Sequence, residues 1–369
     1  MTNTVGIRRY DYIEFYVGSA KMVAYWFSKA MGLKITAYKG PETGCRDRSS
    51  YLLEKDQIKF VVSSPLQPST ADMQLFLQAH GDGVKRFALE VDNVAKAFEY
   101  AVAHGAIPSQ SLKVQEEDEK GYVETAAIRL YDDSEIVFLN RDNYSGHFLP
   151  EFGEPVQVMD IDCQDTGLSF VDHIVGNVRE NEMNQWADYF NRSLDFETFV
   201  DFGPGDISTK YSALLSKVVR SKDNRVKNPI NEPFEGVRMS QIEEFIKEYR
   251  GTGIQHIAIQ TNDILSSIEA LRANGVEFLR VPDTYYDAMR EVNPDIKENI
   301  DDLQKLGILM DFEGDGYLLQ LFMKPIFDRP TFFFEIIQRQ GRSEGFGQGN
   351  FQALFEAIEL DQEKRGNLV

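Results

Sequence analysis

The chain has 369 residues, of which 42% are hydrophobic and 27% charged, as in folded globular proteins. This length predicts two domains, because single hydrophobic cores stop growing at roughly 250–300 residues. With 39 basic against 59 acidic residues, the net charge is −20, which repels nucleic acids and anionic membranes. An anionic ligand would therefore need a local cation, such as a metal ion, to hold it.

Cysteine usage and the first residues add two exclusions. Cys45 and Cys163 lie far apart with no CxxC spacing, so neither a disulfide framework nor a thiolate metal site is indicated. The first residues lack the apolar core of a signal peptide, and no run approaches the ~18 apolar residues of a membrane span. We therefore expect a cytoplasmic protein.

In chain order, the first half opens with a predicted strand, residues 11–17 (DYIEFYV), and then a helix with apolar residues at 23, 26, 27 and 30. That spacing is typical of an amphipathic helix. The second half opens in the same way at residues 172–178 (DHIVGNV). The sequence therefore contains an internal repeat.

A second segment shows the repeat more clearly. Residues 83–106 align with residues 253–276 without a gap, and both predict a strand, a helix and a glycine stop. Each half closes with a strand that ends in a polar residue and an arginine, EIVFLNR at 135–141 and FFEIIQR at 333–339. Each half is thus expected to hold two βαβ-type modules followed by further strands.

The segment between the halves, residues 142–167, carries glycine, proline and aspartate with little periodicity, which is typical of a connection. We place the boundary near residue 155, between an N-terminal domain of residues 1–155 and a C-terminal domain of residues 156–369. The predicted fold class is α+β. Its mixed sheets should curl into a barrel-like shape, so that one face of each half lines a cavity.

Positions at which the two copies differ in chemical type are candidates for function, because a duplicated fold keeps its packing in both copies. Three such positions carry histidine or glutamate in the second copy only. The pairs are His173 with Tyr12, His256 with Arg86, and Glu335 with Val137.

A single histidine on a strand is more often an ordinary core or surface residue than a metal ligand, so neither histidine is decisive alone. Glu335 is more informative. Strand alternation puts it on the same face as Phe333 and Ile337, where a bare carboxylate would carry a heavy desolvation cost. A cation is therefore expected beside it.

Two imidazoles and one carboxylate form the facial triad of non-haem Fe(II) oxygenases, which leaves positions of the ion open. Structural zinc usually has a closed site with thiolate ligands, and the sequence has no thiolate pattern here. The predicted site is one Fe(II) held by His173, His256 and Glu335, with O2 as cosubstrate.

At these residues the chain resembles the 4-hydroxyphenylpyruvate dioxygenase family of the vicinal-oxygen-chelate superfamily. The resemblance covers nearly the whole chain and rests on VDHIVGNV, PINEP, GTGIQHIAIQTNDI, FFEIIQR and GFGQGNFQALFEAIE, in the family's order and spacing. It implies the same three iron ligands and two tandem domains of the glyoxalase/bleomycin-resistance type. The implied reaction converts an aromatic α-keto acid, 4-hydroxyphenylpyruvate, into homogentisate and CO2 in tyrosine catabolism. A homo-oligomer with a structural first half and a gating last helix is also implied.

The resemblance further implies which side chains line the substrate pocket. Asn231, Gln241 and Gln320 would orient the substrate for reaction, and Phe346 and Phe351 would sandwich its ring. The full set is Ser216, Asn231, Gln241, Gln255, Gln320, Phe333, Phe346 and Phe351.

Three of these residues also have ordinary interpretations. Asn231 lies between two prolines and could simply shape a turn. Gln255 neighbours His256, so strict strand alternation would point it to the opposite face. Phe351 begins an apolar stripe of a terminal helix, spaced i, i+3, i+4 and i+7; docked over the pocket, that helix would exclude water.

Three other functions compete with the dioxygenase. 4-Hydroxymandelate synthase shares the ligands and substrate, but it typically has a smaller aliphatic residue where this chain has Phe351. An extradiol catechol dioxygenase typically needs a further histidine, and all the remaining histidines precede His173. The third is a metal-dependent protein that binds an aromatic ligand without turnover. The full-length resemblance favours the dioxygenase.

Overall fold

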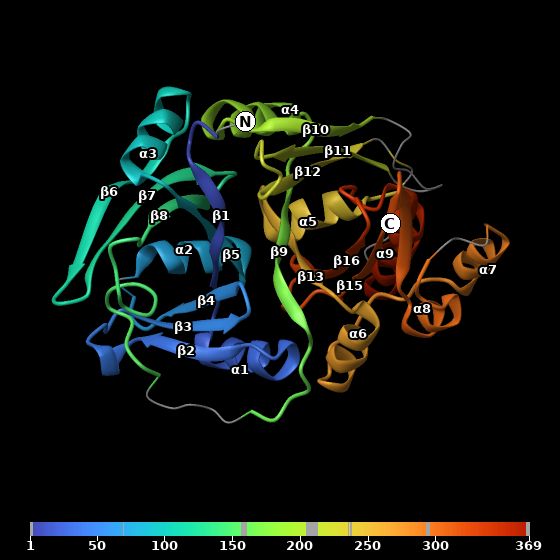
Figure 1. Cartoon of the computed structure of the whole chain (residues 1–369), viewed down its shortest axis with the longest axis horizontal. Helices are drawn as coiled ribbons and strands as arrows, with labels where there is room; N and C mark the ends of the chain where they lie inside the picture. Colours follow the sequence, from blue (N-terminus) through green and yellow to red (C-terminus); the bar gives the residue numbers. More distant parts are fainter. Residues whose placement is uncertain are drawn as a thin grey trace.

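The computed structural model describes residues 3–68, 70–155, 161–203, 213–234, 236, 238–292 and 296–366. Their strands form two mixed eight-stranded sheets, one in each half of the chain. Figure 1 shows the two halves side by side, the first in blue to green and the second in green to red. The α+β class, the curled mixed sheets and the internal repeat are confirmed.

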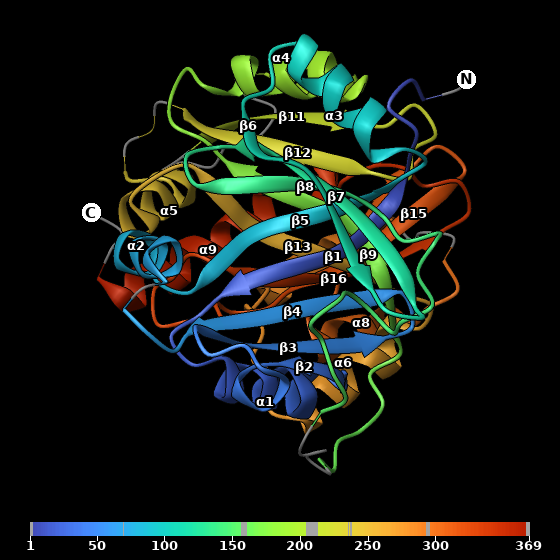
Figure 2. The same ribbon diagram turned by 90° about the vertical axis from the view of Figure 1, so that its left-hand side faces the viewer.

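The first half contains eleven of the described helices and strands. In chain order they are β1 (Ile7–Tyr16), α1 (Ala20–Met31), β2 (Lys34–Lys39), β3 (Arg48–Lys55), β4 (Ile58–Pro65), α2 (Ala71–His80), β5 (Gly83–Val91), α3 (Val94–Ala103), β6 (Pro108–Glu117), β7 (Gly121–Leu130) and β8 (Ser134–Asn140). Across the sheet the order is β2-β3-β4-β1-β5-β8-β7-β6, as Figure 2 shows from the side of this half.

The second half repeats this order as β10-β11-β12-β9-β13-β16-β15-β14. Its elements are β9 (Leu168–Asn177), α4 (Met183–Leu194), β10 (Glu197–Phe202), β11 (Ala213–Arg220), β12 (Lys227–Phe234), α5 (Gln241–Tyr249), β13 (Gly253–Thr261), α6 (Ile264–Ala273), α7 (Asp283–Val292), α8 (Ile300–Leu306), β14 (Leu309–Glu313), β15 (Gly316–Phe322), β16 (Phe333–Gln340) and α9 (Phe351–Arg365). Among the described elements, α7, α8 and α9 have no counterpart in the first half.

The repeat extends to single residues. Glu335 on β16 pairs with Ala258 on β13, and Val137 on β8 pairs with Ala88 on β5. The alignment that matched Glu335 with Val137 is therefore the alignment of the two sheets. The predicted domain boundary near residue 155 falls in the connection between β8 and β9, next to residues 156–160, which are outside the described part. Its position stays a prediction.

Central strands are buried on both faces. Phe15 of β1 and Phe60 of β4 pack against Phe332 and Phe334 of the second half, with the rings of Phe60 and Phe334 stacked 5.6 Å apart. These rings belong to one hydrophobic core that joins the two sheets. Residues alternate along a strand, so Glu335, next to Phe334, points the other way, into the interior of its own curled sheet.

Candidate metal centre and pocket

Three neighbouring strands bring the two histidines and the glutamate together. Ala258 on β13 pairs with His173 on β9 at one side and with Glu335 on β16 at the other. His256 lies two residues before Ala258, on the same face of β13. Paired residues on adjacent strands are about 5 Å apart, and the small Ala258 side chain leaves the space between them open. The three polar side chains therefore converge.

The convergence is tight and buried. The Nε2 atoms of His173 and His256 lie 3.2 and 3.5 Å from Oε2 of Glu335, and one ligand atom from each residue lies within 4.8 Å of the others. The three side chains are 5%, 12% and 4% exposed. Within the described part of the chain, this is the one group of three or more histidine, cysteine or acidic residues with this geometry.

The outer nitrogen of each imidazole has its own partner. Nδ1 of His173 donates to Oδ1 of Asp172 at 2.8 Å, and Nδ1 of His256 donates to Oε1 of Gln255 at 2.9 Å. With the protons held at Nδ1, the lone pairs of both Nε2 atoms are directed at the space beside Glu335. Such outer partners orient metal-ligating histidines in general. The donor set fits a divalent cation.

Gln255 faces the pocket together with His256, although strand alternation predicts opposite faces. The pairing of β13 with β9 shifts register between Ile254 and His256, which indicates a β-bulge at Gln255. A bulge re-aims a side chain, and here it lets two consecutive residues act on the same site. The interpretation of Gln255 as an outward-facing residue is therefore not supported.

The pKa shifts reflect this crowding. Burial alone would raise the pKa of Glu335, but the two facing imidazoles lower it to about 2. Burial opposes charge on His173, yet Asp172 and Glu335 raise its pKa above the usual value. The pKa of His256 is lowered, because burial outweighs the attraction of Glu335. Glu335 is thus held as a carboxylate, which is the form that binds a metal.

Two aromatic rings cover the imidazoles. Phe333 stacks on His256 with ring centroids 4.9 Å apart and planes at 14°. Phe346 meets His173 edge-on at 5.1 Å and 73°. Both phenylalanines line the same small cavity as the three ligands, together with Phe322 and Phe202. The site is therefore shielded from water on two sides.

Most of the predicted pocket residues meet in this cavity. Ser216 and Asn231, which pair across β11 and β12, and Gln241, at the start of α5, line it with the ligands. Gln320 is not among its lining residues. Both amide atoms of that buried side chain are without a hydrogen-bond partner among the described residues, and they lie against Gly347. The place of Gln320 in a substrate pocket stays a prediction, and the side chain of Phe351 lies outside the described part.

The matching positions in the first half carry other residue types. Arg86 lies 3.1 Å from Glu14 and 3.2 Å from Glu135, and it donates to the hydroxyl of Tyr16 at 2.9 Å. Tyr12, the counterpart of His173, packs among apolar side chains. The first half thus has an arginine at the position of His256 and apolar packing around Tyr12 and Val137.

One functional element escaped the comparison of the repeats because both copies contain it. Asp172 accepts hydrogen bonds from Arg339 at 2.8 and 3.0 Å, and the guanidinium of Arg339 lies 5.6 Å from the ring centre of Phe346. Asp11 and Arg141 form the same pair at 2.7 Å in the first half. A comparison that looks only for differences between the copies does not reveal this ion pair. The aspartate and arginine that both copies share were the sequence signal for it.

Comparison with known proteins agrees with this geometry. The family model described as "Hydroxyphenylpyruvate dioxygenase, HPPD, N-terminal" matches residues 1–164, and that of the "Glyoxalase/Bleomycin resistance protein/Dioxygenase superfamily" matches residues 170–321. The 4-hydroxyphenylpyruvate dioxygenase of Caenorhabditis elegans is 43% identical, over 97% of this chain and 93% of its own. That of Yarrowia lipolytica is 44% identical, over 100% and 96%. This chain belongs to the 4-hydroxyphenylpyruvate dioxygenase family.

Solved structures show the same fold. A triple mutant of 4-hydroxymandelate synthase from Streptomyces coelicolor superimposes with a TM-score of 0.85 and 26% identity, over 97% of this chain and 99% of that one. Members of the dioxygenase family depend on Fe(II) and O2, and the buried cluster supplies the ligand types that Fe(II) needs. None of the helices in the described ranges is long and apolar enough to span a membrane.

Replacement of Glu335 by Gln should abolish most of the Fe(II) affinity, because an amide cannot supply the charge that two neutral imidazoles leave unbalanced. The loss should exceed the about 10–100-fold that follows removal of an outer partner, as measured by anaerobic Fe(II) titration. Val137→Ala, at the matched position of the first half, should leave Fe(II) affinity unchanged. Equal Fe(II) binding by Glu335→Gln and wild type would rule out this ligand set.

Replacement of Asp172 by Asn should weaken Fe(II) binding by about 10–100-fold, because the charge that orients His173 is lost. It should also destabilise the fold by roughly 3–5 kcal/mol, since Arg339 loses its partner. Asp11→Asn breaks the matched pair with Arg141 and is the control. It should cost similar stability in urea unfolding without changing Fe(II) affinity; a parallel loss of Fe(II) in both variants would contradict the assignment.

Proposed function

We propose that this chain converts 4-hydroxyphenylpyruvate and O2 into homogentisate and CO2, with Fe(II) held by His173, His256 and Glu335. One observation carries the proposal: the buried cluster of two imidazoles and a carboxylate lies in a chain that is 43% identical, almost end to end, to a curated dioxygenase of this name. The cluster uses only three positions of the ion, so the substrate and O2 can reach the others.

When bound, Fe(II) supplies the electrons and the template for oxidative decarboxylation. The surrounding side chains would do the rest. Ser216, Asn231 and Gln241 offer a hydroxyl and two amides on one side of the cavity, suited to orienting the keto acid and the phenol. Phe333 and Phe346 provide apolar surface for the ring and exclude water.

Substrate entry requires movement in this proposal. The cavity at the ligands has a volume of about 60 Å³, well below the roughly 300 Å³ at which typical ligand pockets begin. The covering residue Phe346 belongs to a segment that leads into α9. Displacement of this segment would open the cavity, in keeping with a gating role for the last helix and for Phe351.

4-Hydroxymandelate synthase remains the second candidate, because a synthase of that name shares the fold. The curated relatives favour the dioxygenase, since several of that name are 41–44% identical to this chain. We also propose that residues 1–155 have a structural role and that the chain assembles into a homo-oligomer. Its proposed location is the cytoplasm, and its proposed pathway is tyrosine catabolism. Sedimentation velocity would test the oligomer.

The products decide between the candidates. Fe(II)-loaded protein mixed with 4-hydroxyphenylpyruvate that carries ¹⁴C in its carboxyl group, without oxygen, and then exposed to O2 should release homogentisate and an equal amount of CO2. Chromatography and ¹⁴CO2 trapping would follow the two products. 4-Hydroxymandelate as the main product would select the synthase. A ring-cleavage product would indicate an extradiol enzyme. Stable binding of the keto acid without turnover would indicate a binding protein.

Removal of the hydroxyl of Ser216 should lower kcat/KM for 4-hydroxyphenylpyruvate by roughly 5–10-fold, the worth of about one hydrogen bond. Ser50→Ala is the matched control, because Ser50 pairs with Ser63 on β3 and β4 as Ser216 pairs with Asn231 on β11 and β12. That variant should retain wild-type kinetics. Unchanged kcat/KM in Ser216→Ala would remove this residue from the pocket.

A further inference from the structure

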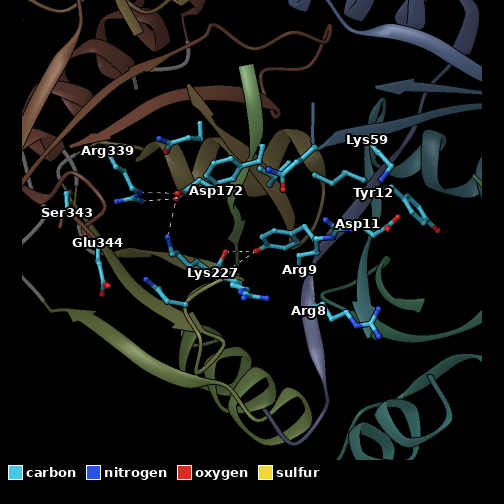
Figure 3. Close-up of a pocket in the computed structure, with 18 of the residues that line it drawn as sticks. Arg8, Arg9, Asp11, Tyr12, Lys59, Asp172, Lys227, Arg339, Ser343 and Glu344 are labelled. Carbon is cyan, nitrogen blue, oxygen red and sulfur yellow. Dashed lines mark hydrogen bonds and ion pairs between the residues drawn. The ribbon is translucent and has the colours of Figure 1, made fainter. Parts of the chain in front are cut away.

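A second, larger pocket of about 750 Å³ lies between the two halves. Residues of β1 and β4 form one side, and residues of β9, β13 and the ends of β12 and β16 form the other. Tyr10 of the first half bridges it, donating to the carbonyl of Lys227 at 2.7 Å. Figure 3 shows this pocket with Asp172 between Arg339 and Lys227. It is distinct from the cavity at the metal ligands.

The pocket is basic although the protein is strongly acidic. Seven of its lining side chains are basic and three are acidic, whereas the whole chain has a net charge of −20. Arg8 and Arg9 are neutralised by nearby carboxylates. Among the described residues, no carboxylate oxygen lies within 4.0 Å of the side-chain nitrogens of Lys59 or Arg342. Positive charge is therefore left over in this pocket.

Two buried donor groups in the wall also have few partners among the described residues. Lys227 is 9% exposed at its side chain, and its nearest carboxylate oxygen, on Asp172, is 3.5 Å away. The hydroxyl of Ser343 is buried without a hydrogen-bond partner among the described residues. Buried polar groups are normally satisfied. Both Lys227 and Ser343 are donors on residues that line one basic pocket, which suits a ligand with acceptor oxygens.

The pocket shares residues with the metal site. Asp172, which orients His173, lines the pocket, and so does Arg339. Arg339 also donates to the carbonyl of Gly345 at 2.6 Å, next to Phe346. Residues 341–344 line the basic pocket, while Phe346 lines the metal cavity. One short segment thus forms a wall of both spaces.

We propose that the basic pocket binds a small organic dianion, and that its occupancy holds the segment of residues 341–346 over the metal cavity. The ligand oxygens would accept hydrogen bonds from Lys59, Lys227 and Arg342. Phe170, 37% exposed in the pocket wall, gives apolar surface for the ligand's carbon skeleton. The volume suits a small molecule, and the recognition chemistry is shared by phosphate monoesters and dicarboxylates.

Binding can be measured on the full-length, Fe(II)-loaded protein without oxygen, by calorimetry with phenyl phosphate and, separately, with phthalate. We expect at least one probe to bind. Lys59→Gln combined with Arg342→Gln should weaken that binding by at least about tenfold, the effect of losing one charge-assisted hydrogen bond. The charge-matched control is Lys34→Gln with Lys305→Gln, on exposed positions away from the pocket, and should change it less than about twofold.

Two results would overturn the site. One is no binding of either probe; the other is equal binding by wild type and the Lys59→Gln/Arg342→Gln variant, which would indicate attachment at the metal or a diffuse charge effect. Hydrogen exchange tests the coupling. The probe should slow exchange of the backbone amides of residues 341–347 in wild type and not in the double variant. Unchanged exchange in wild type with the probe bound would refute the coupling.

Discussion

A carboxylate buried against two imidazole nitrogens is the constraint on which the second half depends. Glu335 is 3% exposed, and its only close polar neighbours among the described residues are the Nε2 atoms of His173 and His256. Three groups that each offer a lone pair cannot face one another in a low-dielectric interior without a cation or proton between them. The metal centre is therefore part of the packing of this half. The strands around Ala258 bring the three groups together.

The first half solves the same packing problem differently. There Tyr12, Ala88 and Val137 pack in an apolar cluster, and Arg86, at the position of His256, pairs with Glu14 and Glu135. Among its described residues, the first half therefore gathers no set of metal ligands at the matched place. The Asp–Arg ion pair is common to both halves, which indicates that its basic role is structural. Only in the second half is the residue next to the aspartate a histidine, His173, so that the aspartate also orients a metal ligand.

Sequence reasoning found the fold class, the repeat and the cluster, because the two copies align without a gap over their central segment and that alignment is also the alignment of the two sheets. At Gln255 strand alternation alone indicated the opposite face, whereas a register shift turns the side chain into the cavity, as the family resemblance implied. Sequence reasoning missed Arg339, since a residue kept in both copies shows no difference to compare. The helices α7 and α8 have no counterpart in the first copy, so the repeat could not predict them. The pocket between the halves was out of reach for another reason: its residues come from six separate segments, and no local pattern links them.

Charge balance connects the two cavities of the second half. Asp172 is a single carboxylate that faces His173, Arg339 and Lys227. One negative charge cannot balance both the guanidinium of Arg339 and the ammonium of Lys227, although burial lowers the pKa of Lys227. The overall charge of −20 does not remove the remaining positive charge, because exposed charges are screened over about 8–10 Å. The aspartate that orients a metal ligand thereby leaves the neighbouring pocket basic. A change in one site must then alter the electrostatics of the other.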